Sequence, residues 1–536
     1  MFTKKIKYGA NYLLITIITL AILMVINFLS TKRFIRLDFT QNKLYTISKS
    51  TKKQLKKLDD LVNIKVYFSK KLPPYLLPLQ QQVKDILSEY RAYSKQKIQV
   101  EFIDPSENKE LQQNLQKMGI PQVQLNIREK DKIQVMNAYL GIGIFFEDKK
   151  EVIPMIQDTS SFEYDLTRAL IKITGDGEKK IAFLSGHEEH NINQEYLILK
   201  KELEGQYQVS TADTSKGEPI PNDIDTLIVA GPKNLQDKDK LEIDQFLMKK
   251  GKVIFLIDSI EYPQQFLFVT SRNHNLDDLL NHYGIILNKN LILDRVNEVA
   301  SFSSGYFSYS IPYPFWPKIL SENIDKTCPI INKLEGISFP WISSIEIIKE
   351  KCKDKKVIEL FKTTKMAWEQ ESQQMGNYMN GYNLDPQMLL LGQPPKKGKQ
   401  YVLGAYLCGK FTSFYANKPL PIEKGKNREI IKESSDKSQI IVVGDSNFLT
   451  QSHLSQVNLT FALNAIDFLS LGEDLIEIRS RETTDRPLKE VSEQIKNICK
   501  YANIIGIPCI LIFIGFVRFF LKNKEKKMYD NLIASK

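Results

Sequence analysis

The sequence predicts an α/β fold, with a small domain followed by a larger open domain whose strands run parallel. Four short apolar runs, "KIAFLSG", "DTLIVAGP", "KVIFLIDS" and "QIIVVGDS", recur between polar or helical segments. Their apolar character is continuous, which is typical of strands covered by helices on both faces. A separate strand and helix pattern precedes them, and an apolar segment lies near each end of the chain.

Length and charge narrow the classes of protein. The chain of 536 residues is too long for one compact domain, and its 42% apolar and 26% charged residues are ordinary globular composition. The net charge of +11 is spread out, except for tight clusters at Lys4–Lys7 and Lys522–Lys527. Both clusters flank apolar segments, which favours a membrane role, and we expect no nucleic-acid partner.

The two apolar segments are predicted to be transmembrane anchors. Residues 8–30, "YGANYLLITIITLAILMVINFLS", carry no charge and reach the roughly 20 residues that a span needs. A cleavable signal peptide is the alternative, but its apolar part is usually shorter and ends in small residues. Residues 501–521 form the second segment, which carries Arg518 and is followed by "KNKEKK". The positive-inside rule places both ends in the cytoplasm and the body outside it.

The first predicted domain covers residues 33–150. Thr46 or Ser48 can cap a short helix, and Val62–Ser69 then begins a strand–helix–strand–helix–strand order with two further strands after it. This order resembles a thioredoxin-like domain, with "GIPQV" where such domains carry a proline loop. The redox CxxC is absent, so no redox chemistry is expected. "GIGIFF" lies within a strand and is not a dinucleotide fingerprint.

The second predicted domain covers residues 151–475. It begins with the amphipathic helix "SFEYDLTRALIKI" and includes "DKDKLEIDQFLMKKG", which Gly251 ends, and "NLTFALNAIDFLS". An insertion at about 262–435 is aromatic and proline-rich at first, as in an ordered loop or partner surface, and its later part is expected to be mobile. Residues 476–500 form a linker to the second anchor.

Small and acidic residues follow the four predicted parallel strands. In such sheets the ligand crevice lies at the carboxyl ends of the strands, although Gly, Asp and Ser are also ordinary turn and cap residues. Asp445 can bind a ligand or cap the next helix. The candidate crevice residues are Ser185, Gly186, His187, Glu188, Gly231, Asp258, Asp445 and Ser446.

"HEEH", residues 187–190, is the densest group of candidate ligands. His187 and His190 are spaced i, i+3, whereas the zinc-protease motif needs i, i+4. A third ligand would have to come from His274, His282 or a distant carboxylate. We therefore predict neither a metal nor a catalytic residue, and keep a membrane-tethered hydrolase or metal enzyme using this cluster as the alternative. Glu188 and Glu189 are expected near the N-terminus of the next helix, where negative charge is favourable.

The remaining motifs of the sequence give little support for a nucleotide, cofactor or disulfide site. "GQPPKKGKQ" has one residue too many between its glycines for a P-loop, and Gln400 stands where Ser or Thr should bind magnesium. Nucleotide hydrolysis and a bound cofactor are therefore not expected. The five cysteines form no CxxC pair, and a disulfide between Cys328 and Cys352 stays open.

Several stretches in this order resemble one family. They are "RLDFTQNKLYTIS", "IKVYFSKKLP", "IAFLSGHEE", "VVGDSNFL" and "LNAIDFLSLGEDLIEIRSRETTDRPL", and they lie between the two anchors. The chain is similar to the auxiliary, substrate-binding-like component of gliding-motility-type ABC transporters. In that family the strand-end motif more often reads Gly-His-Gly-Glu, and here Glu188 replaces the second glycine.

The resemblance implies a non-catalytic membrane subunit that works with separate ATPase and permease subunits. It also implies a flavodoxin-like or glutamine-amidotransferase-like middle domain without the catalytic cysteine. The expected location is the bacterial cytoplasmic (inner) membrane, with most of the chain periplasmic. The resemblance does not identify a cargo.

Overall fold

The computed structural model describes most of the small domain and most of the large domain. The described residues are 15–25, 46–129, 132–156, 159, 161–175, 179–261, 268–304, 307–332, 334–375, 379–386, 397–421, 428–472, 496, 500–502, 504, 506, 508 and 512–524. The chain divides into two compact units, residues 1–482 and 483–536.

The predicted anchors are described only in part. Residues 15–25 and 512–524 are helical, while the rest of 8–30, residues 503, 505, 507 and 509–511 of the second segment, and most of the 476–500 linker lie outside the described residues. Among the residues described, no helix is both long enough and apolar enough to cross a membrane.

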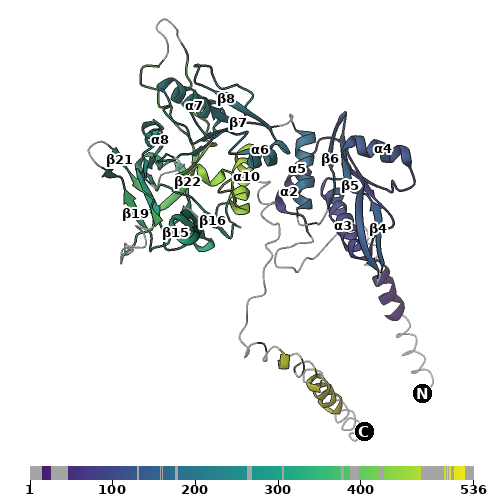
Figure 1. The fold of residues 1–536 in the computed structure, drawn as a ribbon. Helices are drawn as coiled ribbons and strands as arrows, with labels where there is room; N and C mark the ends of the chain where they lie inside the picture. Colours follow the sequence, from purple (N-terminus) through teal and green to yellow (C-terminus); the bar gives the residue numbers. More distant parts are fainter. Residues whose placement is uncertain are drawn as a thin grey trace, which may run out of the picture. The chain divides into compact units, whose positions relative to one another are not determined.

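The small domain is built on a four-stranded sheet with the order β2-β1-β5-β6 (Figure 1). β1 is parallel to β2 and antiparallel to β5, and β5 is antiparallel to β6. The strands are β1 (Val62–Phe68), β2 (Ile98–Ile103), β5 (Leu140–Phe146) and β6 (Lys149–Ile153). A separate hairpin, β3 (Val123–Glu129) with β4 (Lys132–Ala138), contains the third predicted strand, so "GIPQV" does not lead into the main sheet.

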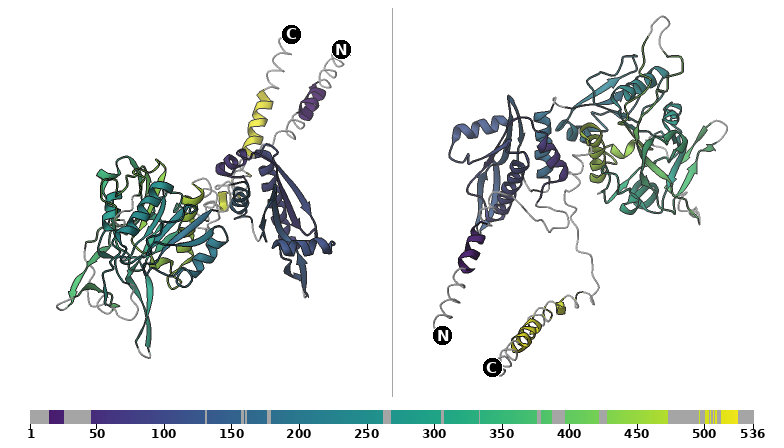
Figure 2. Two further views of the ribbon diagram at one scale, coloured as in Figure 1. Left: turned by 90° about the horizontal axis from the view of Figure 1, so that it is seen from above. Right: turned by 180° about the vertical axis from the view of Figure 1, so that it is seen from behind.

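Helices cover both faces of this sheet (Figure 2). α2 (Lys49–Lys56), α3 (Leu77–Tyr93) and α5 (Phe162–Thr174) share one core with the sheet, and α4 (Lys109–Met118) packs on the other face through Leu115. Ser48 caps α2, because its side chain accepts a hydrogen bond from the Thr51 amide at 2.9 Å. Thr46, the other candidate cap, is not the capping residue.

The boundary predicted at residue 150 is therefore too early. β6 pairs with β5, and α5 buries Phe162, Leu166 and Leu170 in the core of the small sheet. Periodicity identified α5 as a helix with one apolar face, but it could not say which sheet that face covers.

The large domain contains a nine-stranded mixed sheet with the order β12-β17-β22-β23-β10-β9-β7-β8, and β18 pairs with β22 off this path. The four predicted strands lie side by side and parallel, as the apolar runs indicated. The bounds are β7 (Lys180–Ser185), β8 (Gln208–Asp213), β9 (Thr226–Ala230), β10 (Lys252–Leu256), β12 (Ile285–Leu287), β17 (Ile345–Ile347), β18 (Lys355–Lys362), β22 (Val402–Gly409) and β23 (Ser438–Val443).

This strand order corrects two predictions: the large sheet is mixed and not purely parallel, and the insertion adds strands to it. β22 is antiparallel to β23, and β12, β17 and β18 extend the sheet further, so the insertion supplies four of its strands. The strands of three or four residues are too short for a periodic signal. The insertion also forms β11 (Phe268–Thr270), β13 (Asn290–Leu293), β14 (Asn297–Ser304), β15 (Phe307–Leu320), β16 (Gly336–Ser338), β19 (Trp368–Glu371), β20 (Gln373–Met375) and β21 (Met379–Asn383).

Two apolar cores lie on the two faces of the large sheet. α6 (Leu197–Glu204) and α10 (Gln456–Leu471) contribute to one, and α7 (Asp237–Lys250) and α8 (Asp277–Tyr283) contribute to the other. Alternate residues of each central strand enter opposite cores, as with Ile181 and Ala182 of β7. Gly251 ends α7 with a left-handed φ of 73°, as predicted.

α10 differs from the amphipathic helix predicted for it. Its residues from Asn458 to Ser470 are buried with the exception of Thr460. Its Asn464 side chain donates to the Ile330 carbonyl of the insertion at 3.0 Å, so the insertion covers a face that the sequence left open to solvent.

Cys328 and Cys352 do not pair. Both are buried, and they belong to the two different cores of the large domain.

Candidate functional site

Four of the predicted crevice residues, Gly231, Asp258, Asp445 and Ser446, lie together because β9, β10 and β23 are neighbours in the sheet. Leu256 of β10 pairs with Val443 of β23 on one side and with Ala230 of β9 on the other. The residues that follow these strands therefore share one edge, where the carboxyl ends of parallel strands meet. Asp258, Asp445 and Ser446 are all at most 3% exposed.

Asp258 is the centre of a hydrogen-bond network at this edge. Its Oδ1 accepts from the Ser446 amide at 2.6 Å and from Asn447 Nδ2 at 3.0 Å. Its Oδ2 accepts from the Ser446 hydroxyl at 2.5 Å. Both carboxylate oxygens are thus engaged by the residues that follow β23.

Arg272 fills the space in front of Asp258. Its Nη1 lies 3.3 Å from Asp258 Oδ2, and its Nη2 donates to the carbonyl oxygens of Gly231 and Glu188. The side chain is only 3% exposed. Arg272 could not be predicted from the sequence, because it lies in the insertion and no motif connects it to the strand ends.

Asp445 lies beside this pair of charged groups. Its Oδ1 accepts from the amide of Asn447 at 2.7 Å and from its Nδ2 at 3.1 Å, which closes a turn. The predicted cap of the next helix is not formed, because the helical turn Asn447–Leu449 has Ser446 at its N-cap position and no side-chain cap. Burial raises the pKa of Asp445 well above its usual range, and the nearby Asp258 carboxylate raises it further. Oδ2 of Asp445 has no hydrogen-bond partner among the described residues.

Gly231 stands where a side chain would not fit. Its φ is +58°, and a Cβ there would lie 2.6 Å from Ser446 Oγ and 2.8 Å from Asp258 Oδ2. The glycine thus lets the network close against the backbone of β9.

The histidines of "HEEH" have separate partners. His187 Nε2 lies 2.9 Å from the Thr214 hydroxyl and 3.6 Å from Asp239 Oδ1, whereas His190 Nε2 lies 3.0 Å from Asn447 Oδ1. Within the described part of the chain, no group of three or more His, Cys, Asp or Glu side chains is arranged to hold a metal ion.

The glutamates of this motif do not lie at a helix N-terminus. α6 starts ten residues after His187, at Leu197, and "HEEH" forms a turn instead. The Glu189 carboxylate accepts from the Gly186 amide at 3.1 Å and from the His187 amide at 2.7 Å. The prediction failed because a side chain can satisfy strand-end amides without any helix nearby.

Glu188 has a left-handed backbone, with a φ of 50°. A glycine adopts such a conformation without steric cost, whereas a glutamate does not.

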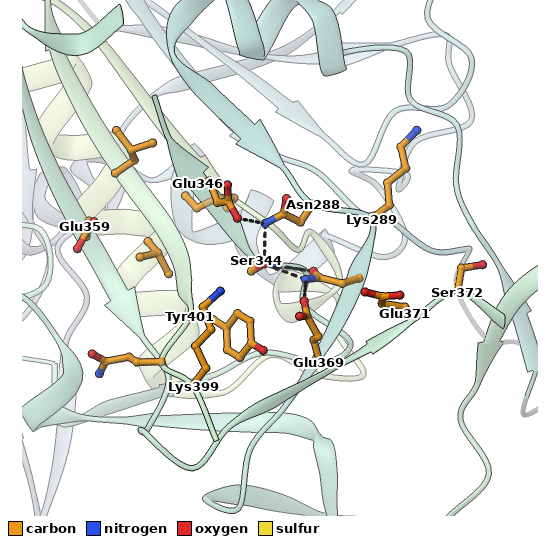
Figure 3. Close-up of a pocket in the computed structure, with 15 residues that line it drawn as sticks. Asn288, Lys289, Ser344, Glu346, Glu359, Glu369, Glu371, Ser372, Lys399 and Tyr401 are labelled. Atoms are coloured by element: carbon orange, nitrogen blue, oxygen red, sulfur yellow. Dashed lines mark hydrogen bonds between the residues drawn. The ribbon is translucent and has the colours of Figure 1, made fainter. Parts of the chain in front are cut away.

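A separate polar pocket of about 670 Å³ lies near this network (Figure 3). Two contacts join the two places: the Ser259 hydroxyl donates to the Asn288 carbonyl at 3.3 Å, and the Ser343 amide donates to the Gly444 carbonyl at 3.0 Å. The lining residues are Asn288, Lys289, Asn290, Ser344–Ile347, Glu359, Glu369, Glu371, Ser372 and Lys399–Val402.

The floor of the pocket is a chain of hydrogen bonds. Asn288 Nδ2 donates to Glu346 Oε1 at 3.3 Å and to Ser344 Oγ at 3.0 Å. Asn290 Nδ2 donates to the same Ser344 oxygen at 3.1 Å and to Glu369 Oε2 at 2.6 Å. Burial raises the pKa of Tyr401, and the Glu369 carboxylate beside it raises it further. This pocket could not be predicted from the sequence, because its residues come from short segments that are distant in the chain.

The geometry is that of an α/β protein whose strand-end edge is filled by its own side chains and which has a polar pocket of about 670 Å³ beside that edge. The family described as an ABC-type uncharacterized transport system matches residues 178–470. The chain belongs to this family. The strands of the large sheet and the edge network all lie within the matched range. A domain of unknown function matches residues 41–144.

The chain is also similar to individual proteins. An uncharacterized protein of Borreliella burgdorferi (strain ATCC 35210 / DSM 4680 / CIP 102532 / B31) is 29% identical over 501 residues, which is 91% of this chain and 94% of that protein.

Among solved structures, the mmIFT52 N-terminal domain covers 58% of this chain and 100% of its own, at 13% identity and a TM-score of 0.33. The exo-beta-1,4-mannosidase Op5Man5 from Opitutaceae bacterium strain TAV5 covers 74% of this chain and 50% of its own, at 9% identity and a TM-score of 0.22.

Proposed function

We propose that the chain is a non-catalytic auxiliary subunit of an ABC transporter of the gliding-motility type. Segments 8–30 and 501–521 anchor it in the bacterial cytoplasmic membrane, and its body lies on the periplasmic side. There it binds the permease and ATPase assembly or an exported ligand. The family match over residues 178–470 is the observation that carries this proposal.

The strand-end network supports a structural role for the predicted crevice. Asp258 accepts hydrogen bonds from Ser446 and Asn447, and Arg272 lies against it, so these groups already have partners within the protein. A general acid or base needs reach to a substrate proton. We therefore assign the crevice residues to stabilisation of the body, and the polar pocket to binding.

The ends of the chain support anchoring. The helical residues 15–25 and 512–524 expose large apolar side chains, among them Met24 at 73% and Phe513 at 69%. Such side chains are stable in a lipid environment, and Lys522 and Lys524 follow the second segment as flanking positive charges.

The small domain supports the thioredoxin-like assignment through its sheet order. A parallel β1–β2 pair is followed by the antiparallel β5–β6 pair, with helices on both faces. The domain has no cysteine between residues 33 and 150, so we propose it as a binding module and not as a redox enzyme.

The test is copurification of the full-length chain from its native membranes, combined with labelling of single cysteines in the body. We expect ABC ATPase and permease subunits to copurify, and a reagent that does not cross the membrane to label the body from outside. A chain recovered without either subunit would contradict the proposal. Stoichiometric zinc, iron or manganese in the purified protein would instead favour the metal-enzyme alternative at His187–His190.

A further inference from the structure

We propose that the polar pocket binds an extended, basic peptide segment of a partner protein, which adds to the free edge of β17. This inference rests on the proposed function, because it specifies how an auxiliary subunit would recognise another component. Three properties of the pocket carry it: an incomplete strand ladder, unbalanced negative charge, and the spacing of that charge.

The ladder is incomplete on one side of β17. All three residues of β17 pair with β12, but only Ile345 pairs with β22, opposite Val402. Beyond this pair, Glu346 and Ile347 line the pocket on one side and Lys399 to Tyr401 line it on another. The pocket thus lies where the two strands separate. A strand edge without a neighbour is a template for an extended peptide.

The charge of the pocket is unbalanced. In the described chain, Glu346, Glu369 and Glu371 have no ion-pair partner, and the groups that bond Glu346 and Glu369 are neutral. Three other charged groups line the pocket: Glu359 pairs with Lys362 at 2.6 Å, Lys289 pairs with Asp277 at 3.3 Å, and Lys399 Nζ lies 5.2 Å from the centre of the Tyr401 ring. The four glutamates still outnumber the two lysines of the lining. The pocket therefore complements lysine or arginine side chains and not acidic ones.

The spacing of the acidic groups fits a strand. Glu369 and Glu371 are exposed on β19, whereas Trp368 and Gln370 are half-buried, so the two glutamates lie on the same face. Residues i and i+2 of an extended peptide have the same period of two residues. A Lys-x-Lys or Arg-x-Arg segment would place its charges in register with Glu369 and Glu371, while its backbone pairs with β17.

The experiment measures binding of short peptides to the purified full-length chain by calorimetry. The probe is the peptide Lys-Val-Lys-Val-Lys with blocked ends, and its acidic twin is Glu-Val-Glu-Val-Glu. An N-methylated basic peptide lacks the amides that pair with a strand edge, and spermine carries the charge without a peptide backbone. We expect the basic peptide to bind at least about tenfold more tightly than each of the other three.

The variant is the triple substitution Glu346→Gln, Glu369→Gln and Glu371→Gln, which removes charge and keeps shape. We expect it to weaken binding of the basic peptide by about tenfold or more, in line with three charge pairs of modest strength. Its matched control is Glu335→Gln, Glu350→Gln and Glu433→Gln, which makes the same charge change at exposed positions outside the pocket. The control should bind like the unaltered chain, and thermal unfolding should show that both variants fold.

Other results would overturn the inference. Equal binding of spermine or of the N-methylated peptide would mean that no strand is added, and equal binding by the two triple variants would place the site elsewhere. The outcome is separable from the proposed function. A chain that copurifies with transporter subunits but binds no basic peptide defeats only this inference, and one that binds the peptide but copurifies with no subunit defeats only the proposed function.

Discussion

Ser446 holds Asp258 through two hydrogen bonds, one from its amide to Oδ1 at 2.6 Å and one from its hydroxyl to Oδ2 at 2.5 Å. The two residues are 188 positions apart in the sequence and follow neighbouring parallel strands. Hydrogen bonds to a buried carboxylate are stronger than those between neutral groups. This contact therefore joins the two halves of the large domain that the insertion separates.

Arg272→Ala should destabilise the large domain by about 3–5 kcal/mol, because it leaves Asp258 buried without its cation. Low millimolar ethylguanidinium should restore part of the loss, since it can occupy the vacated space, and Arg272→Lys should restore less because lysine lacks the planar fork. Thermal unfolding measures both effects. Arg428→Ala is the control, since its pair with Glu242 is more exposed and should matter less. A loss for Arg272→Ala no larger than for Arg428→Ala would contradict the role given to Arg272.

Asp445→Asn should change how stability depends on pH. The pKa of Asp445 is raised, so the folded state holds the proton more tightly, and stability falls as the pH rises from about 3.9 through the raised value. The asparagine variant should lack this decline. Urea unfolding of both proteins between pH 4 and 8 gives the difference, and parallel curves would refute the prediction.

Subtracting one stability curve from the other also removes the pH dependence that His453 contributes, which has the opposite sign to that of Asp445. Burial, aided by His190, lowers the pKa of His453 to about 4. For His453 alone, stability rises as the pH rises from about 4 to the usual histidine value near 6.5. This effect is the same in both proteins and cancels.

Gly231→Ala should cost about 3 kcal/mol or more, because the new methyl group meets Ser446 and Asp258 and the φ of 58° is unfavourable. Gly119→Ala is a matched control, with a φ of 88° and no heavy atom within 4 Å of the added Cβ. It should cost only the backbone strain, about 1–2 kcal/mol. Similar losses of unfolding free energy in the two variants would mean that the network does not close against Gly231.

Glu188→Gly should stabilise the chain by up to about 1 kcal/mol, since glycine accepts the φ of 50° without steric cost. The substitution also removes the contact with Lys233 at 3.6 Å, but Glu188 is 75% exposed there, so the pair contributes little. Chemical unfolding measures the change. Glu189→Gly should instead be destabilising, because it removes the acceptor for two backbone amides.

Tyr164→Phe should uncouple the unfolding of the two domains. Tyr164 of α5 donates to Asp467 Oδ2 at 2.5 Å, and Tyr207 donates to Oδ1 of the same carboxylate at 2.6 Å. Tyr207→Phe is the control, because it removes a comparable bond that lies wholly within the large domain. Each change should cost about 1–3 kcal/mol, but only Tyr164→Phe should separate the two transitions in calorimetry. A single unchanged transition in Tyr164→Phe would argue against coupling through Asp467.

The strand ends could be predicted from sequence because their signal is local. A continuous apolar run followed by Gly, Asp or Ser marks both a buried strand and its end, and neighbouring parallel strands bring such ends together. In the structure Asp258 and Ser446 lie at one edge, where Ser446 donates two hydrogen bonds to Asp258. The end of α7 at Gly251 followed from equally local chemistry.

The partners of these residues could not be predicted in the same way. Arg272, Asn447 and the short strands of the insertion acquire their roles from contacts between distant segments. A strand of three residues such as β17 gives no periodic pattern, and one arginine in a long insertion looks like any surface arginine. The glutamates of "HEEH" were expected to lie at the N-terminus of a helix. Instead, Glu189 accepts hydrogen bonds from the strand-end amides of Gly186 and His187.

The central position of β23 has a consequence for how the chain is made. β23 spans Ser438–Val443, yet it lies between β10 and β22 in the middle of the large sheet. During synthesis, β7, β9 and β10 therefore leave the ribosome while one edge of β10 is unpaired. Nearly two hundred further residues must be made before β23 can pair with that edge. Until then the apolar edge of β10 is open to aggregation or to a chaperone, so the nascent chain is most vulnerable while the insertion is being made.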